Sequence, residues 1–525
     1  MGNYEKHTGI DLHDVQGNII RGYGAFGFPF ARYVLFRVRT EDAGRAFVEG
    51  LIPLVTTSAP WTQYGDVGSG TAKPDVTTNV AFTHDGLRYL GVPEKSLLSF
   101  PDDFAMGMRA RVDILGDDRG SAPERWDPVW LSDTHPQPVH ILVTINAKSP
   151  DLREARYDEI TAVLNQVNAE HADGVEQLAG HRSGGGEEAK YQEASAVFKD
   201  GIPTHQEHFG YTDGISNPYF RESGGHPDYQ TGGGKRVYGE SATTPDGWDA
   251  LATGEFLLGH ADEAREYPAA PIPSVLAKNG SFLVYRKLHQ NVKSFDDYLA
   301  SEGAKFGDEE LFSAKLVGRW KNGAPLATFP TKQEADDFVA ALDAARAAYY
   351  ADRSDKQKKT TYYDLKRQQR AFDYRDDIPG ASCPVGAHAR RVNPRGALEF
   401  GEDGAFGKRP GALVDRRRIA RRGLPYGESD IRDDDGDHGI VFMAIGASIS
   451  RQFEFVQQQW VNYGNDFKLA NDRDPVIGNH GADGGRMVIE ADPDGTDPPF
   501  FCTGIPRFVE TRGGDYFFVP SLTAL

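Results

Sequence analysis

Short segments in which apolar and polar residues partly alternate are separated along this chain by segments in which apolar residues recur at helical spacing. Alternation among β-branched and aromatic residues is typical of half-buried strands. It predicts strands over residues 31–39, 138–147, 280–288 and 439–447. Helical spacing predicts a helix over 151–171, after Ser149-Pro150, and further helices that begin at 295–299 and cover 453–461.

The predicted strands are too widely separated for the tight repeating order of a doubly wound parallel sheet. Separated strands with interposed helices instead favour an α+β fold. A glycine-rich stretch over 223–235 predicts a surface loop or a connection between domains. Over 331–370, apolar residues at helical spacing and many alanines predict a peripheral helical insertion in the second half of the chain.

The chain has 525 residues, of which 39% are hydrophobic, so it is long enough for two or more domains with substantial cores. Its formal net charge of −19 argues against nucleic acid or an anionic membrane as a partner, because phosphate would be repelled. No run of about 18 apolar residues predicts a membrane span. Residues 1–7 lack the charged-then-apolar pattern of a signal peptide, and we therefore expect a cytoplasmic protein.

Asp213 lies in the motif Gly210-Tyr211-Thr212-Asp213-Gly214, with no lysine or arginine within six residues on either side. Glycine permits left-handed backbone angles and close approach to other groups, so the motif predicts a shaped loop that presents the carboxylate. An ordinary turn remains the alternative, because Asp-Gly is among the commonest turn dipeptides.

His388 lies among small residues and is followed by arginines at 390, 391 and 395. Small neighbours leave room for a large flat group against the imidazole, and arginines can bind carboxylates or phosphates through paired hydrogen bonds. A neutral imidazole is also a common metal ligand, including for haem iron. The alternative is a hydrogen-bonded core histidine beside a solvated basic loop. The two cysteines, Cys383 and Cys502, cannot form a disulfide framework, a zinc cluster or a Cys-x-x-Cys-His haem attachment.

A basic run over 416–422 is followed by turn residues up to Gly427. Most of these arginines are expected to be solvated, and the acidic residues around the run argue against a nucleic-acid site. One arginine turned inward could still stabilise an anion in a pocket.

Taken together, Asp213, His388 and Arg421 give the chain its resemblance to the dye-decolourising peroxidases. This haem peroxidase family has two ferredoxin-like α+β domains, with antiparallel sheets and peripheral helices. The length and the helical insertion resemble the larger bacterial members. The matching segments are 14–23, 210–214, 280–284, 388–395, 421–427, 451–457 and 512–521.

The resemblance implies a role for each matching residue. His388 corresponds to the proximal ligand of the haem iron, and Asp213 and Arg421 correspond to the distal pair above it. Arg421 is chosen over Arg422 for its spacing to the Leu424-Pro425-Tyr426-Gly427 segment.

Four further cofactor contacts are implied. Arg395 corresponds to a partner of a haem propionate. Glu454 falls near the position of an acidic group that hydrogen-bonds the proximal imidazole. Ile440 and Phe442 correspond to apolar residues of the distal wall.

The resemblance also implies one non-covalently bound haem b per chain, hydrogen peroxide as the oxidant, organic electron donors such as dyes and phenolic compounds, and a homo-oligomer as an open option. It divides the chain into an N-terminal ferredoxin-like domain (1–221) that carries the Asp213 motif, a connecting region (222–279) and a C-terminal ferredoxin-like haem-binding domain (280–525), with the insertion at about 331–370.

Two other classes of function remain open from the sequence. A haem-binding or haem-handling protein without peroxidase turnover would need His388, but not Asp213 together with Arg421. A metal-dependent hydrolase would need Asp and His ligands. His205 and His208 come nearest to such a set, but the chain has no His-x-x-x-His pair of the helical zinc type.

Overall fold

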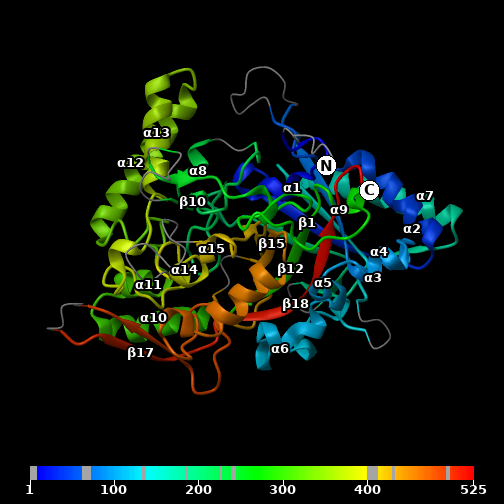
Figure 1. Ribbon diagram of the computed structural model, residues 1–525. Coiled ribbons are helices and arrows are strands. Elements are labelled where there is room, and N and C mark those ends of the chain that lie inside the picture. The colour runs from blue at the N-terminus through cyan, green and yellow to red at the C-terminus, as the bar shows by residue number, and fades with distance from the viewer. Residues whose placement is uncertain are drawn as a thin grey trace.

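A central antiparallel sheet draws strands from both halves of the chain (Figure 1). The computed structural model describes residues 9–61, 72–132, 137–183, 187–224, 227–237, 244, 246–398, 412–428, 432–491 and 497–525. The strand order is β13 (Ala420–Arg421), β15 (Gly439–Gly446), β12 (Ser281–Gln290), β18 (Val509–Val519), β2 (Val76–Phe82), β3 (Ile141–Ala147), β1 (Phe30–Val38) and β4 (Val175–Gln177), with β14 (Leu424–Tyr426) beside β15 and β7 (Gln192–Ser195) beside β1.

Smaller two-stranded ladders and helices surround this sheet. The ladders pair β5 (His181–Ser183) with β6 (Glu187–Ala189), β8 (Phe198–Lys199) with β9 (Ile202–Pro203), β10 (Lys235–Arg236) with β11 (Trp248–Asp249), and β16 (Gly485–Ile489) with β17 (Phe500–Ile505). The longer helices are α2 (Glu41–Leu51), α3 (His84–Tyr89), α7 (Pro150–Glu170), α10 (Val292–Phe306), α11 (Glu309–Val317), α12 (Lys332–Ala351) and α13 (Lys356–Gln368). The short ones are α1 (Gly17–Ile20), α4 (Glu94–Leu97), α5 (Asp102–Met106), α6 (Val112–Leu115), α8 (Gln230–Gly233), α9 (Ser274–Ala277), α14 (His388–Val392) and α15 (Ala412–Asp415).

The predicted elements correspond closely to observed ones. The strand predictions are confirmed as β1, β3, β12 and β15, and the predicted helix over 151–171 is confirmed as α7. The helical insertion is the hairpin of α12 and α13, which stands at the edge of the molecule (Figure 1). The segment over 453–461 is helical but forms two π-helical stretches, Ser450–Glu454 and Val456–Val461. Such wide turns often occur at functional sites.

The two halves of the sheet meet where β18 pairs with β2, at the register pair Phe518 and Phe82. The buried ring of Phe518 also contacts Phe100 at 5.3 Å and Phe282 at 6.0 Å between centroids. These aromatic residues belong to one hydrophobic core, which is therefore continuous across the junction. Burial of each such side chain contributes about 1.5–3 kcal/mol to the stability of the fold. The fold is therefore α+β as predicted, whereas the domain boundaries at 221 and 280 stay a prediction.

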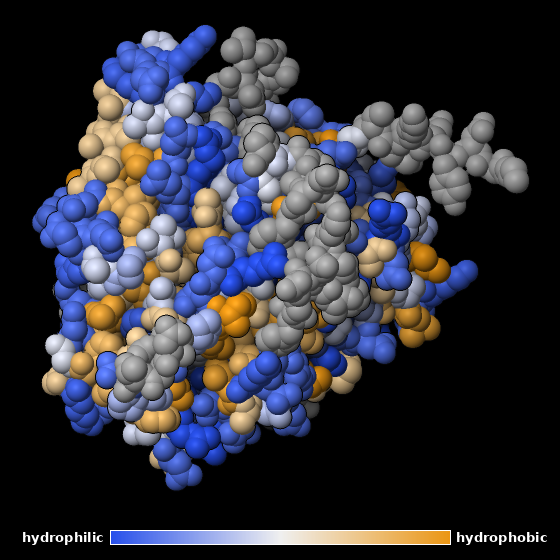
Figure 2. Space-filling view, turned by 60° about the vertical axis from the view of Figure 1, so that its left-hand side comes forward, coloured by the Kyte–Doolittle hydropathy of each residue, from blue (hydrophilic) through white to orange (hydrophobic). Residues whose placement is uncertain are grey.

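The surface agrees with the acidic, polar composition. Hydrophilic and hydrophobic residues are intermingled on the face shown in Figure 2. Among the described residues, no helix combines the length and the apolar character needed to cross a membrane.

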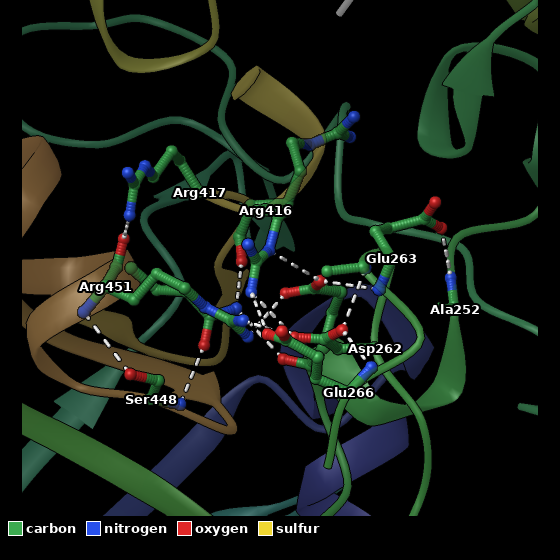
Figure 3. Close-up of polar contacts among 12 residues, drawn as sticks. Ala252, Asp262, Glu263, Glu266, Arg416, Arg417, Ser448 and Arg451 are labelled. Atoms are coloured by element: carbon green, nitrogen blue, oxygen red, sulfur yellow. Dashed lines mark hydrogen bonds and ion pairs between the residues drawn. The ribbon is translucent and has the colours of Figure 1, made fainter. Parts of the chain in front are cut away.

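A buried ion cluster ties three segments together beside the sheet (Figure 3). Glu255 and Asp262 have side chains that are 0% and 1% exposed. Arg451, in the first π-helical stretch, contacts Glu255 at 2.9 Å and Asp262 at 2.5 Å. Arg416 contacts Asp262 at 2.9 Å. We call these four residues the Glu255 cluster; it anchors the start of the π-helical segment and the chain that leads into β13.

Glu255 has an unusual protonation equilibrium. Burial raises the pKa of its carboxyl to about 7, although Arg451 opposes the shift. Between its ordinary pKa near 4.5 and about 7, the folded protein holds a proton on Glu255 that the unfolded chain has released. The folded state then binds more protons, so the contribution of Glu255 to stability falls as pH rises through this interval.

We therefore expect Glu255→Gln to remove part of the pH dependence of stability. The free energy of unfolding of the unsubstituted protein should fall by about 3 kcal/mol relative to that of the variant between pH 4.5 and 7. Denaturant unfolding of both proteins across this range measures the difference. Parallel curves would contradict the assignment.

Candidate active site

One cavity of about 320 Å³ is lined by residues of β12, β15 and β18 and by residues of loops and helices outside the sheet. Its volume is in the range of cofactor and small-molecule sites. The predicted site residues that line it are Asp213, His388, Arg395, Arg421, Ile440 and Phe442. The structure thus brings together residues that are up to 229 positions apart in the sequence, from 213 to 442.

The backbone around Asp213 takes the shape that its glycines predicted. Gly210 and Gly214 have φ angles of 90° and 78°, in the left-handed region that favours glycine. The Asp213 amide donates to the carbonyl of His205 at 2.8 Å, and the Gly214 amide donates to the Asp213 carboxylate at 2.6 Å. The motif is therefore a fixed loop that presents Asp213 to the cavity.

Glu207 stabilises this loop through hydrogen bonds to its backbone amides. Its carboxylate accepts hydrogen bonds from the amides of Phe209 at 2.9 Å and Tyr211 at 2.8 Å. It also accepts one from the side-chain amide of Gln290 at 2.5 Å, which links the loop to β12. The sequence analysis missed Glu207, because a single glutamate three residues before a glycine carries no signal of this role.

Arg421 supplies the positive charge that the sequence around Asp213 lacks. Its guanidinium forms an ion pair with the Asp213 carboxylate across 208 residues of sequence. The Arg421 amide donates to Asn217 at 2.9 Å, and β13 pairs Arg421 with Ala444 of β15. The neighbouring Arg422 instead donates to backbone carbonyls of the N-terminal segment, including Ile19 at 2.6 Å. The alternation of side chains along β13 explains why Arg421 faces the cavity.

This ion pair keeps Asp213 charged. Burial alone would raise the pKa of its carboxyl, but Arg421 and the Gly214 amide together lower it below its usual range. Asp213 lies deep in the protein, yet 49% of its side-chain surface is accessible because it lines the cavity. It is therefore an ionised carboxylate that a small molecule in the cavity can reach.

His388 begins α14 and also lines the cavity. Its Nδ1 lies 2.9 Å from the carboxylate of Asp474, which also accepts the amides of Val476 at 2.8 Å and Ile477 at 2.9 Å. Burial opposes charge on both groups, but their mutual attraction raises the pKa of His388 and lowers that of Asp474. Because ionised Asp474 accepts the Nδ1 proton, Nε2 is the ring nitrogen left to bind a metal.

Known proteins are similar to this chain along almost its whole length. A family model described as the DyP dimeric α+β barrel domain matches residues 14–181. Peroxidase 2 of Mycetinis scorodonius is 27% identical over 99% of this chain and 87% of its own length. The structure of an ancestral D-type dye-decolorizing peroxidase is 26% identical, covers 98% of both chains and superposes with a TM-score of 0.70. The chain is thus similar to dye-decolorizing peroxidases over almost its whole length.

A further relative comes from a bacterium, whereas Mycetinis scorodonius is a fungus. The multifunctional dye peroxidase DyP2 of Amycolatopsis is 33% identical over 62% of this chain and 61% of its own length. The specific resemblance to the larger bacterial members stays a prediction. The similarity to dye-decolorizing peroxidases implies a haem cofactor.

The cavity has the properties that a haem requires. The His388 Nε2 is available for iron, and the walls include apolar side chains such as Ile440 and Phe442. Arg395 and Arg319 line the same cavity, and within the described part of the chain neither forms an ion pair with a carboxylate. Buried cations without anionic partners match the propionates of haem.

These two arginines are held by uncharged groups. Arg395 donates to the carbonyls of Arg370, at 2.7 Å, and of Phe372. Arg319 donates to Ser216 at 3.1 Å and to the carbonyl of Gly323 at 3.0 Å. Burial lowers the pKa of Arg395 to about 9 and that of Arg319 to about 10. Arg319 is a cavity residue that the sequence analysis missed.

The expectation that Glu454 hydrogen-bonds the proximal imidazole is wrong. Its side chain is 3% exposed and forms an ion pair with Arg111, with Nη2 at 2.6 Å, and accepts the Tyr516 hydroxyl at 2.8 Å. The π-helical segment directs Glu454 toward β18 and residue 111, while Asp474 takes the position beside His388. The metal-hydrolase alternative also lacks support, because no cluster of three His, Cys, Asp or Glu ligands occurs among the described residues.

Asp474 and Glu454 are expected to differ in their effect on cofactor binding. Asp474→Asn should weaken haem binding about 10- to 100-fold, because a weaker acceptor no longer fixes the imidazole of His388. Glu454→Gln should leave haem affinity within twofold and lower stability by about 1–3 kcal/mol, since Arg111 and Tyr516 lose a charged partner.

Titration of the haem-free variants with haemin, followed by absorbance, measures both affinities. A larger loss of affinity in Glu454→Gln than in Asp474→Asn would restore Glu454 as the group that supports His388.

Proposed function

We propose that this enzyme binds one haem b non-covalently in the cavity of its C-terminal domain, with the Nε2 of His388 as the iron ligand. It reduces hydrogen peroxide and oxidises organic reductants, such as dyes and phenolic compounds, in one-electron steps. The observation that carries the proposal is that the His388–Asp474 pair and the Asp213–Arg421 pair line the same cavity.

Bound haem iron would supply the site that takes up a peroxide oxygen together with two oxidising equivalents. The residues of this chain then have to move a proton from one peroxide oxygen to the other. Asp213 is suited to this task, because it is ionised, reachable from the cavity and fixed by its loop. It accepts the proton from the first oxygen and returns it to the second as the O–O bond breaks.

Arg421 has two functions in this proposal. Its guanidinium keeps Asp213 in the accepting form, and its positive charge stabilises the negative charge that develops on the departing oxygen. Both depend on the ion pair that β13 and Asn217 hold in place.

The His388–Asp474 hydrogen bond orients the imidazole and increases its electron donation from Nε2. Such donation favours the higher oxidation states that peroxide chemistry demands. A haem-handling protein without turnover would need this pair alone. The presence of Asp213 and Arg421 in the same cavity therefore favours the peroxidase.

Asp213→Asn should slow the reaction with peroxide by about 100-fold or more while haem stays bound, because the proton acceptor is lost. Arg421→Leu should slow it by a similar factor through lost charge stabilisation. Stopped-flow absorbance after mixing with peroxide measures the rate. An unchanged rate in both variants would exclude the distal pair from the mechanism.

The pH dependence of the same rate separates the two roles of Arg421. In the unsubstituted enzyme the rate should fall only in acid, below the ordinary carboxyl pKa, since Arg421 lowers the pKa of Asp213. In Arg421→Leu the largest influence that opposes burial is lost, so the pKa of Asp213 should rise and the acid limb should move to higher pH. An acid limb at the same pH in both proteins would show that another group titrates.

His388→Ala should abolish stable haem binding, since no other histidine occurs among the described residues that line the cavity. The haem absorption band after purification, with protein quantified independently, measures occupancy. Full occupancy with an unchanged spectrum would remove His388 as the ligand.

A further inference from the structure

Part of the cavity lining is polar and comes from segments other than those that carry the predicted site residues. It includes Asp117, Arg286, Gln290, Asn479 and Thr511, which come from the turn after α6, from β12, from the segment after Asp474 and from β18. We call these five residues the Arg286 alcove.

Arg286 and Asp117 form the floor of the alcove. Their side chains are 4% and 3% exposed, and Nη2 of Arg286 lies 2.5 Å from Oδ1 of Asp117. The Thr511 hydroxyl donates to the same carboxylate oxygen at 2.9 Å and also contacts Arg286. The opposite charges of this pair cancel, so the floor is polar but carries no net charge.

Four buried polar atoms of the alcove have no hydrogen-bond partner among the described residues. One is a donor, Nη1 of Arg286. Three are acceptors: Oδ2 of Asp117, Oε1 of Gln290 and Oδ1 of Asn479. Leaving a buried polar atom unpaired costs about 1–3 kcal/mol, more when it is charged. Four such atoms that line one cavity indicate a site that binds a polar guest.

The chemistry of these atoms restricts the guest. An anion, including a haem propionate, would meet one free donor and three acceptors, and the nearby carboxylate of Asp117 would repel it. A cation would meet the guanidinium of Arg286. A neutral molecule with two O–H donors and a free lone pair can instead donate to two of the acceptors and accept from Nη1 of Arg286.

We propose that the Arg286 alcove binds a small neutral molecule with two O–H donors, either water or hydrogen peroxide, beside the catalytic part of the cavity. Gln290 links the two regions, because its amide nitrogen donates to Glu207, which holds the Asp213 loop. Only the peroxide option rests on the proposed function; water binding does not depend on turnover.

Leu288 offers a way to fill the alcove without removing its polar atoms. It lines the cavity and lies on β12 between Arg286 and Gln290, on the same face of the strand. Leu288→Phe adds bulk at this position, while Leu288→Met keeps the volume nearly unchanged and serves as the matched control.

The first measurement is a high-resolution crystal structure of the haem-loaded protein without peroxide, for the unsubstituted enzyme and both variants. We expect ordered solvent within hydrogen-bond distance of Arg286 Nη1 and Asp117 Oδ2 in the unsubstituted enzyme and in Leu288→Met, and its loss in Leu288→Phe. Absence of solvent in the unsubstituted enzyme, or a haem substituent bound to these atoms, would overturn the proposal. This result does not depend on whether the enzyme turns over.

The second measurement identifies the guest, with the resting absorption spectrum as a check that the haem is undisturbed. If the alcove takes up hydrogen peroxide, the stopped-flow rate at low peroxide should fall about fivefold in Leu288→Phe but not in Leu288→Met. If it holds water alone, both variants should react at the unsubstituted rate while Leu288→Phe still loses the ordered solvent. An equal loss of rate in both variants, with solvent retained, would contradict the proposal.

Discussion

The ion pair between Asp213 and Arg421 is the interaction on which the site depends. It joins a loop from the first half of the chain to a strand from the second, and it lets a deep carboxylate stay charged. Burial and charge oppose each other at this point, and the guanidinium decides the outcome. Without it, burial would raise the pKa of Asp213, and the glycine loop would present a group less suited to accept a proton.

Burial also opposes charge at other residues around the cavity, but different partners act on those charges. His388 and Asp474 balance each other, as do Arg286 and Asp117. Among the described residues, the hydrogen-bond partners of Arg395 and Arg319 are carbonyl and hydroxyl oxygens, and burial lowers the pKa values of both arginines. The cavity lining thus carries positive charge without a carboxylate partner at these two arginines and balanced charge at the alcove. This asymmetry favours one orientation for a bound group that carries its negative charge on one edge.

Much of this arrangement could be predicted from the sequence, for identifiable reasons. The strands β1, β3, β12 and β15 carry their own periodicity, and the Asp213 loop is marked by glycines that need left-handed backbone angles. Asp474 could not be found in this way, because its role depends on a contact across 86 residues that no local pattern encodes. Glu454 was misplaced because the wide turns of a π-helix shift side-chain directions away from those of a regular helix.

The position of β18 has a consequence for how the protein is made. This strand comes after every other described strand of the sheet in the sequence, yet it lies in the middle of the sheet, between β12 and β2. It also contributes Val509 and Thr511 to the cavity. During synthesis the two halves of the sheet cannot join until this final strand has left the ribosome. The cavity is therefore completed only after β18 has been synthesised, and the cofactor must be acquired after that point.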